Sequence, residues 1–319
     1  MSTLHLRPVD LDRDLGELAA LFSLVQDDPT SETELKEDYE AHKERIFCLN
    51  AAEDERGELL GFNWANRDRD QADKAYFYII VKPQHRLKGA GRLLYADAEG
   101  AARAAGIRRI EIHVRDTDPE SRTFAERRGF SERTHSIAMQ MDLDAFDDQP
   151  YDALISRLKD EGFEFTSMET LGNDEESQRR LFRLNDTAAA ETMGTDGSHP
   201  WADFQDFERR VCEAAWYIPA GQMVVIDTNN GEWAAMSAIT RFAGRDYAYN
   251  LFTGVDKRYR GRKLGQAVKV LALRYARDVL GVHVVRTHHN TKNEPILAID
   301  RKFGYTLLPG DYVMVKELA

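Results

Sequence analysis

A segment that occurs twice constrains this chain more than any other feature of its 319 residues. Residues 81–91 read VKPQHRLKGAG and residues 255–265 read VDKRYRGRKLG, and an apolar run precedes each copy. The spacing persists downstream, because Gly106 and Gly281 are 175 positions apart. Matching segments at a constant long spacing indicate that the chain contains two copies of one folding unit.

Each copy has the residues that hold an anion at a turn between a strand and a helix. In the first copy Gly89 and Gly91 lie among basic residues, and glycine lets backbone N–H groups approach an anion closely. A helix that begins at the turn directs its positive end to the same place. A Walker loop is excluded because no Gly-Lys-Ser/Thr follows, and the dinucleotide fingerprint G-x-G-x-x-G is absent. The turns therefore predict pyrophosphate sites.

Composition sets limits on the class of protein. A length of 319 residues predicts two domains, and 42% hydrophobic with 31% charged residues is typical of soluble globular proteins. No apolar run approaches the ~18 residues of a membrane helix, and no secretory signal is visible. The lone cysteines Cys48 and Cys212 predict reduced thiols, so we expect a cytoplasmic protein without disulfides. A net charge of −12 disfavours nucleic acid as a partner and favours a cationic substrate such as an amine. No spacing of histidines or cysteines suits a metal, so we expect none.

Hydrophobic periodicity predicts the same order of elements in both halves: strand, two helices, three strands, helix, strand, helix, strand. The acidic, proline-ending stretch 144–150 is the best candidate for a linker, and an amphipathic helix follows it. We therefore predict a first domain over residues 1–145, a linker and helix over 146–162, and a second domain over 163–319.

At the repeated turns the sequence resembles the GNAT superfamily of acyl-CoA-dependent N-acetyltransferases. The family signature is Arg/Gln-x-x-Gly-x-Gly/Ala, which Arg86, Gly89 and Gly91 match. In the second copy Arg260 and Gly265 match, and Lys263 replaces the middle glycine. The tandem arrangement is similar to that of mycothiol synthase-like enzymes. The resemblance implies an α/β fold of two tandem GNAT domains, each a mixed, mostly antiparallel twisted sheet with helices on both faces.

The resemblance also implies that acetyl-CoA is the acyl donor and that backbone amides of the turns hold it. The implied cofactor-binding residues are Val81, Arg86, Leu87, Lys88, Gly89, Ala90 and Gly91 in the first copy, and Val255, Arg260, Gly261, Arg262, Lys263, Leu264, Gly265, Asn290 and Asn293 in the second. Capping of the following helix is an alternative role for Asn293. Lys263 places a Cβ where the backbone approach is close, so we expect the second site to be altered, with Gly261 restoring some freedom.

Neither copy has the acid and base that are usual in the family. The fourth strands, AYFYIIV and YNLFTGV, lack the glutamate that often serves as base, and Ala125 and Asp300 stand where a tyrosine often serves as acid. His113 and His288 occupy equivalent positions on the fifth strand, and a histidine near neutral pKa suits a general base. We name His288, Asp300 and His113 as catalytic candidates, with a packed or surface role as the alternative for each. Tyr249 is a core aromatic first and an acid candidate second.

The leading hypothesis is an acetyl-CoA-dependent N-acetyltransferase that acts on a primary amine of a small molecule, as a monomer or homodimer. One alternative is an acyl-CoA-binding regulatory protein with one or both sites catalytically degenerate, and another is a tRNA-dependent aminoacyl-transferase. We expect the chemistry in the second half, where His288, Asn293 and Asp300 cluster in one strand-to-helix passage. Its predicted substrate entrance, residues 193–201, contains Asp196, His199 and Trp201.

Overall fold

The computed structural model describes residues 4–192, 197 and 199–318, and the chain divides into two compact units. Unit 1 comprises Met1–His135 and Pro309–Ala319, and unit 2 comprises Ser136–Leu308. In the described part of the chain, no helix has both the length and the apolar character needed to cross a membrane.

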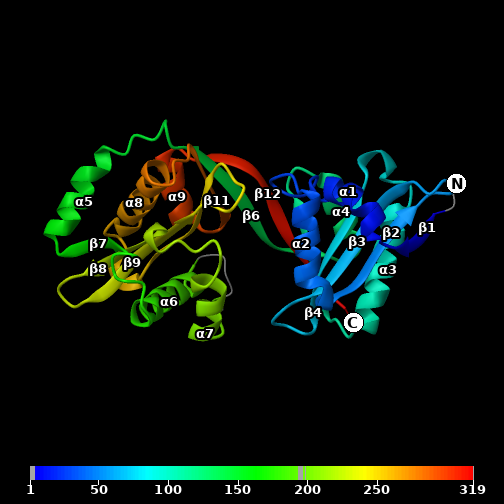
Figure 1. Cartoon of the computed structure of the whole chain (residues 1–319), viewed down its shortest axis with the longest axis horizontal. Helices are drawn as coiled ribbons and strands as arrows, with labels where there is room; N and C mark the ends of the chain where they lie inside the picture. Colours follow the sequence, from blue (N-terminus) through cyan, green and yellow to red (C-terminus); the bar gives the residue numbers. More distant parts are fainter. Residues whose placement is uncertain (1–3, 193–196, 198, 319) are drawn as a thin grey trace. The chain divides into compact units, whose positions relative to one another are not determined.

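Unit 1 is a sheet with helices on both faces (Figure 1). Its elements are β1 (His5–Pro8), α1 (Leu11–Phe22), α2 (Glu32–His42), β2 (Ile46–Glu53), β3 (Leu59–Arg67), β4 (Lys74–Val81), α3 (Ala90–Ala104), β5 (Arg109–Arg115), α4 (Pro119–Glu126) and most of β12 (Thr306–Glu317). The strand order is β1-β2-β3-β4-β5-β12, and of these pairs only β4–β5 is parallel. Successive residues of β4 serve opposite faces, because Phe77 packs in the core beneath α3 while Tyr78 packs in the core with α1 and α2.

Unit 2 has the same arrangement. Its elements are most of β6 (Ser131–Asp142), then α5 (Pro150–Asp160), β7 (Phe163–Ser167), α6 (Glu175–Ala190), α7 (Phe204–Phe207), β8 (Gln222–Asp227), β9 (Glu232–Thr240), β10 (Ala248–Val255), α8 (Leu264–Asp278), β11 (Val284–Asn290) and α9 (Glu294–Phe303). The strand order is β7-β8-β9-β10-β11-β6, and of these pairs only β10–β11 is parallel. The mixed, mostly antiparallel sheets with helices on both faces confirm the predicted fold class.

The last strand of each repeat lies in the sheet of the other unit. In unit 1, β12 pairs with β5 so that Asp311 faces Arg115. In unit 2, β6 pairs with β11 so that Ser136 faces Asn290. Each of these four positions is 175 residues from its counterpart, so the two strands occupy equivalent places in the same register. The compact units therefore differ from the predicted ranges 1–145 and 163–319, because strands with equivalent patterns fit either sheet.

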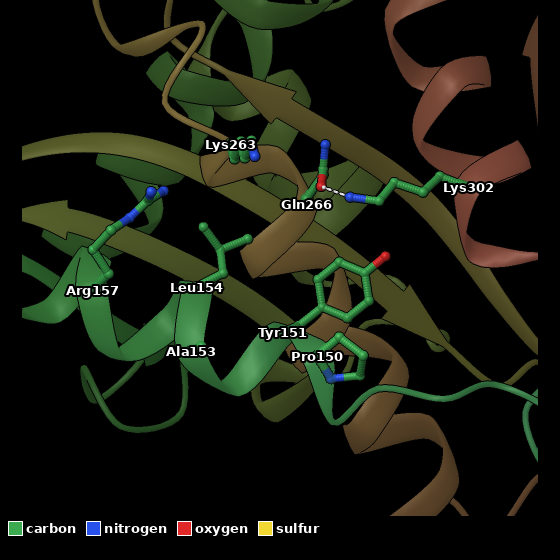
Figure 2. A pocket seen from close by; sticks show the side chains of 8 residues that line it. All are labelled: Pro150, Tyr151, Ala153, Leu154, Arg157, Lys263, Gln266 and Lys302. Carbon is green, nitrogen blue, oxygen red and sulfur yellow. Dashed lines mark hydrogen bonds between the residues drawn. The ribbon is translucent and has the colours of Figure 1, made fainter.

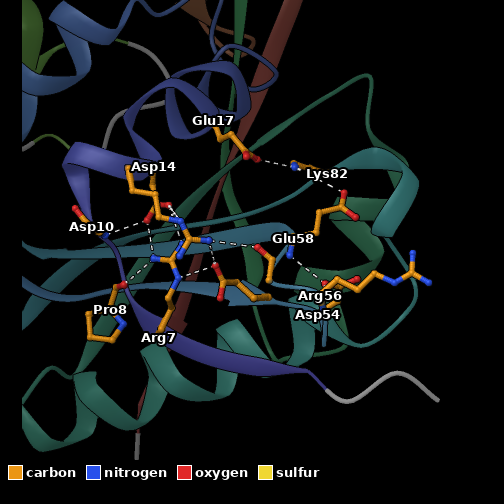
Figure 3. Close-up of polar contacts among 12 residues, drawn as sticks. Arg7, Pro8, Asp10, Asp14, Glu17, Asp54, Arg56, Glu58 and Lys82 are labelled. Carbon is orange, nitrogen blue, oxygen red and sulfur yellow. Dashed lines mark hydrogen bonds and ion pairs between the residues drawn. The ribbon is translucent and has the colours of Figure 1, made fainter.

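Ion pairs fix the position of α1 in unit 1 (Figure 3). Arg7 of β1 donates to both carboxylate oxygens of the buried Asp14, at 2.6 and 2.7 Å, and to Glu53 of β2 at 2.7 Å. Desolvation opposes the charge of Asp14, but its hydrogen bonds with Arg7 outweigh this and lower its pKa. Lys82, directly after β4, pairs with Glu17 of α1 at 2.6 Å. These contacts tie α1 to the start of the glycine-containing turn.

Candidate active site

The parallel strand pair of each unit separates after a few residues. In unit 1, β4 pairs with β5 only at residues 74–76, and in unit 2, β10 pairs with β11 only at residues 248–249. Beyond these points the described strands diverge, and one edge of β4 and of β10 has no strand beside it. Such an edge offers backbone N–H and C=O groups to an extended ligand. Each opening leads to one of the repeated turns.

The two turns have the same backbone conformation at two positions. In unit 1 these are Leu87 and Gly89, with φ of 60° and 103°, and in unit 2 they are Gly261 and Lys263, with φ of 84° and 68°. Each turn thus has one glycine and one other residue in the left-handed region, at opposite positions. Lys263 adopts the left-handed region in place of glycine, so the lysine does not prevent the turn from forming.

The side chains of the first turn are engaged within unit 1. Arg86 donates to Asp118 at 2.8 Å, and Lys88 donates to the carbonyl oxygen of Gln84 at 2.8 Å. Desolvation opposes the charge of Asp118, but hydrogen bonds from Ser121 and the nearby Arg86 guanidinium lower its pKa overall. Leu87 is exposed, Val81 ends β4, and Ala90 is buried at the start of α3. A Cβ on Gly91 would lie 3.2 Å from the ring of Phe124, so glycine permits this close packing.

The second turn leaves one cation without an acidic partner. Arg260 pairs with Glu191 at 2.8 Å and also donates to the carbonyl oxygen of Val255. The Arg262 guanidinium lies 5.5 Å from the centre of the Phe163 ring. Lys263 forms no ion pair with a described residue. A Cβ on Gly265 would lie 3.2 Å from Val255, and Leu264 is buried.

The asparagine at the start of α9 is available for a ligand. Asn293 occupies the N-cap position, but its side chain forms no capping hydrogen bond and none with any other described residue. At the matching position of unit 1, Asp118 accepts a hydrogen bond from the backbone N–H of Ser121. Asn290 accepts from the backbone N–H of Lys292 through its side-chain oxygen. The capping alternative for Asn293 therefore lacks the hydrogen bond that would define it.

Unit 2 has a β-bulge that unit 1 lacks in its described strands. The pairing of β10 with β9 shifts between Asn250 and Phe252, whereas β4 pairs with β3 without a shift. The bulge adds one residue, because Ala75 and Ala248 hold equivalent places 173 positions apart, whereas the turns are 174 apart. We did not predict the bulge, although this change of spacing signals it. Bulges are enriched next to active sites, where they redirect backbone groups.

A tyrosine and a histidine meet where the strands of unit 2 begin to separate. The hydroxyl group of Tyr249 on β10 forms a short hydrogen bond with Nδ1 of His288 on β11, and both residues are half-buried. In unit 1 the matching tyrosine is Tyr76, which donates instead to Asp68 at 2.7 Å. His113, the counterpart of His288, is half-exposed and lies 3.5 Å from Glu111. The sequence equivalence of the two histidines therefore does not extend to their partners.

Asp300 lies in the core of unit 2. It is fully buried and forms hydrogen bonds with the fully buried Lys269 of α8 and, at 2.6 Å, with Nε2 of His289 on β11. Desolvation lowers the pKa of His289, and the hydrogen bond from Asp300 only partly opposes this. Asp300 exposes no surface to a substrate, so the structure separates it from the Tyr249–His288 pair.

Two of the predicted entrance residues are held by α6. Nδ1 of His199 lies 2.5 Å from Asp186, and Nε1 of Trp201 donates to the side chain of Asn185 at 2.9 Å. Asp196 lies outside the described residues. Among the described residues, no cluster of histidine, cysteine, aspartate and glutamate side chains has a geometry that would hold a metal ion.

Comparisons with known proteins place this geometry in a family. The acetyltransferase (GNAT) family model matches residues 15–130, and a GNAT acetyltransferase domain model matches residues 152–287. No curated protein matches the chain. Among solved structures, a GCN5-related N-acetyltransferase from Sphaerobacter thermophilus is similar, with a TM-score of 0.73 and 17% identity over 98% of this chain and 95% of the other.

A second solved structure has the same tandem organisation. It is a tandem GNAT protein from the clavulanic acid biosynthesis pathway, with a TM-score of 0.68 and 20% identity over 99% of this chain and 98% of the other. These low identities show a shared fold, while the two family models cover most of the chain. The chain belongs to the GNAT acetyltransferases and is an acyl-CoA-dependent N-acetyltransferase with two GNAT domains in tandem.

Proposed function

We propose that unit 2 transfers an acetyl group from acetyl-CoA to a primary amine of a small molecule. The hydrogen bond between Tyr249 and His288, placed where β10 and β11 separate, is the observation that carries this proposal. The residues present suit the acyl donor, because the turn at 260–265 offers backbone N–H groups for a pyrophosphate and the free edge of β10 suits an extended arm. Asn293 has an amide donor for the same arm. When bound, acetyl-CoA supplies the activated acyl group.

The chain must move two protons during this reaction. His288 receives the proton that the attacking amine releases, and Tyr249 protonates the departing thiolate. His288 then returns a proton to Tyr249 through their hydrogen bond, so that the amine proton ends on the thiol. The bulge between Asn250 and Phe252 supports a further role for β10, because an amide outside the regular ladder can stabilise the developing oxyanion. Asp300 acts from the core, where it holds His289 and β11 in position.

Unit 1 is proposed to hold a second CoA molecule as a structural cofactor. Its turn has the complete signature, with Arg86, Gly89 and Gly91, but its fourth strand has no bulge. Asp118, at the place of Asn293, is an acceptor only when ionised and is already bonded to Arg86. These features favour binding without turnover in unit 1, which is the regulatory alternative restricted to one half of the chain.

Thiol release with acetyl-CoA and a panel of small amines tests the proposal. Loss of a proton-transfer group typically costs about 10²–10⁴-fold, so we expect Tyr249→Phe and His288→Asn to lower kcat by about 100-fold or more. His113→Asn alters the matching position of unit 1 and should leave kcat unchanged. The assignment is backwards if His113→Asn stops turnover and His288→Asn does not. Binding of CoA by calorimetry without thiol release from any amine would favour the regulatory alternative.

A further inference from the structure

Helix α5 (Pro150–Asp160) is an addition that only the second unit has. The spacing of 175 residues between the repeats would place its counterpart before residue 1. Its apolar face is buried in the core of unit 2 through Tyr151, Ile155 and Leu158, and it packs against α8 and β7. A helix that is absent from one repeat and firmly packed in the other is a candidate for a function specific to unit 2.

A pocket of about 390 Å³ lies between α5 and the start of α8 (Figure 2). Its lining residues come from α5, the second turn, α8 and α9: Pro150, Tyr151, Ala153, Leu154, Arg157, Lys263, Gln266 and Lys302. This volume falls within the range of about 300–1,000 Å³ that is usual for small-molecule sites. Because Lys263 belongs both to the turn and to the pocket wall, a ligand held at the turn adjoins the pocket.

The pocket is cationic in a chain whose net charge is −12. Three of its lining residues are basic and none is acidic. Arg157 pairs only with Glu161, at 3.5 Å between two exposed side chains, which is a weak interaction. Lys302 donates to Gln266 at 3.1 Å, and its ammonium group lies 5.3 Å from the centre of the Tyr151 ring. Three cations around an aromatic ring suit a ligand with both a phosphate and a planar base.

We infer that this pocket binds the 3′-phosphorylated adenosine end of the acyl donor, and that α5 makes unit 2 selective for the 3′-phosphate. The inference rests on the proposed function, in which unit 2 holds acetyl-CoA at the turn 260–265. The adenosine follows directly on the pyrophosphate, so it lies where Lys263 leads into the pocket. Tyr151 and Leu154 offer apolar surface to the base, while Arg157 and Lys302 attract the phosphate dianion.

The test compares acetyl-CoA with acetyl-dephospho-CoA, which lacks the 3′-phosphate. We expect the wild-type chain to bind CoA more tightly than dephospho-CoA by calorimetry, and KM in the thiol-release assay to follow the same order. Loss of one charge-assisted contact typically costs about tenfold in affinity, so Arg157→Gln should reduce the preference by about that factor. Lys159→Gln is the matched control, because Lys159 is exposed on the same helix and does not line the pocket.

Adenosine 3′,5′-bisphosphate completes the test. It should compete with acetyl-CoA in the wild-type chain and compete about tenfold less well in Arg157→Gln. An unchanged preference for CoA in Arg157→Gln, or bisphosphate binding without competition, overturns the inference. A site in unit 1 contributes equally to all three proteins, so differences among them report on unit 2. Calorimetry needs no turnover, so failure of the Tyr249–His288 proposal is distinguishable from failure of this one.

Discussion

At the scale of single residues, the two turns show that one backbone conformation can be built from different residues. Glycine occupies the second left-handed position in unit 1, at Gly89, and the first in unit 2, at Gly261. The sequence located both turns because their spacing and basic residues are visible. It did not show that Lys263 would adopt the conformation of Gly89, since a family signature records residue types and not dihedral angles. The surrounding strand and helix impose the conformation on Lys263 at a local cost.

This local cost can be measured by substituting the two residues in turn. A non-glycine residue in the left-handed region costs roughly 1–2 kcal/mol, and glycine loses roughly 0.5–1 kcal/mol of entropy on folding. We therefore expect Lys263→Gly to raise the free energy of unfolding by about 0.5–1 kcal/mol, and Gly261→Ala to lower it by about 1 kcal/mol. Urea denaturation measures both values. A loss of stability in Lys263→Gly would show that the lysine side chain contributes more than its backbone conformation costs.

At the scale of elements, a buried polar group joins α8, α9 and β11. Lys269, Asp300 and His289 come from these three elements and satisfy one another where apolar packing would be expected. The sequence did not reveal this group, because Lys269 and Asp300 are 31 positions apart and a lysine in a helix usually indicates a solvated face. What the sequence did reveal was that Asp300 stands where the family has a tyrosine. Its environment, and hence its role, came only from the structure.

Removing one member of this group should be costly, and removing two should be less so. Asp300→Leu leaves the Lys269 ammonium group buried without its partner, which typically costs about 3–5 kcal/mol of unfolding free energy. The double variant Asp300→Leu/Lys269→Met replaces both charges with apolar groups and should recover most of that loss. Chemical denaturation of the wild type and of both single variants and the double variant gives the coupling energy. Additive losses would mean that the two side chains do not interact in the folded protein.

At the scale of the whole molecule, the sequence predicted two copies, the order of their elements and the fold class, because these follow from repeat spacing and periodicity. It did not predict which sheet receives each final strand. Met139 of β6 faces Thr287, and Met314 of β12 faces Ile112, and both pairs are related by the same spacing of 175 residues. Since the local patterns are equivalent, the choice depends on how the chain is connected between the repeats and not on the strands themselves.

A matched pair of core substitutions tests the exchange of strands. Met139 and Met314 are each 1% exposed, the first in the core of unit 2 and the second in the core of unit 1. Truncating a buried methionine to alanine typically costs about 2–5 kcal/mol. We expect Met314→Ala, near the C-terminus, to speed hydrogen exchange in β5 of unit 1, and Met139→Ala to speed it in β11 of unit 2. Mass spectrometry of peptides covering residues 109–115 and 284–290 resolves the two strands. The opposite pattern, in which each substitution loosens the sheet of its own sequence repeat, would show that the strands are not exchanged.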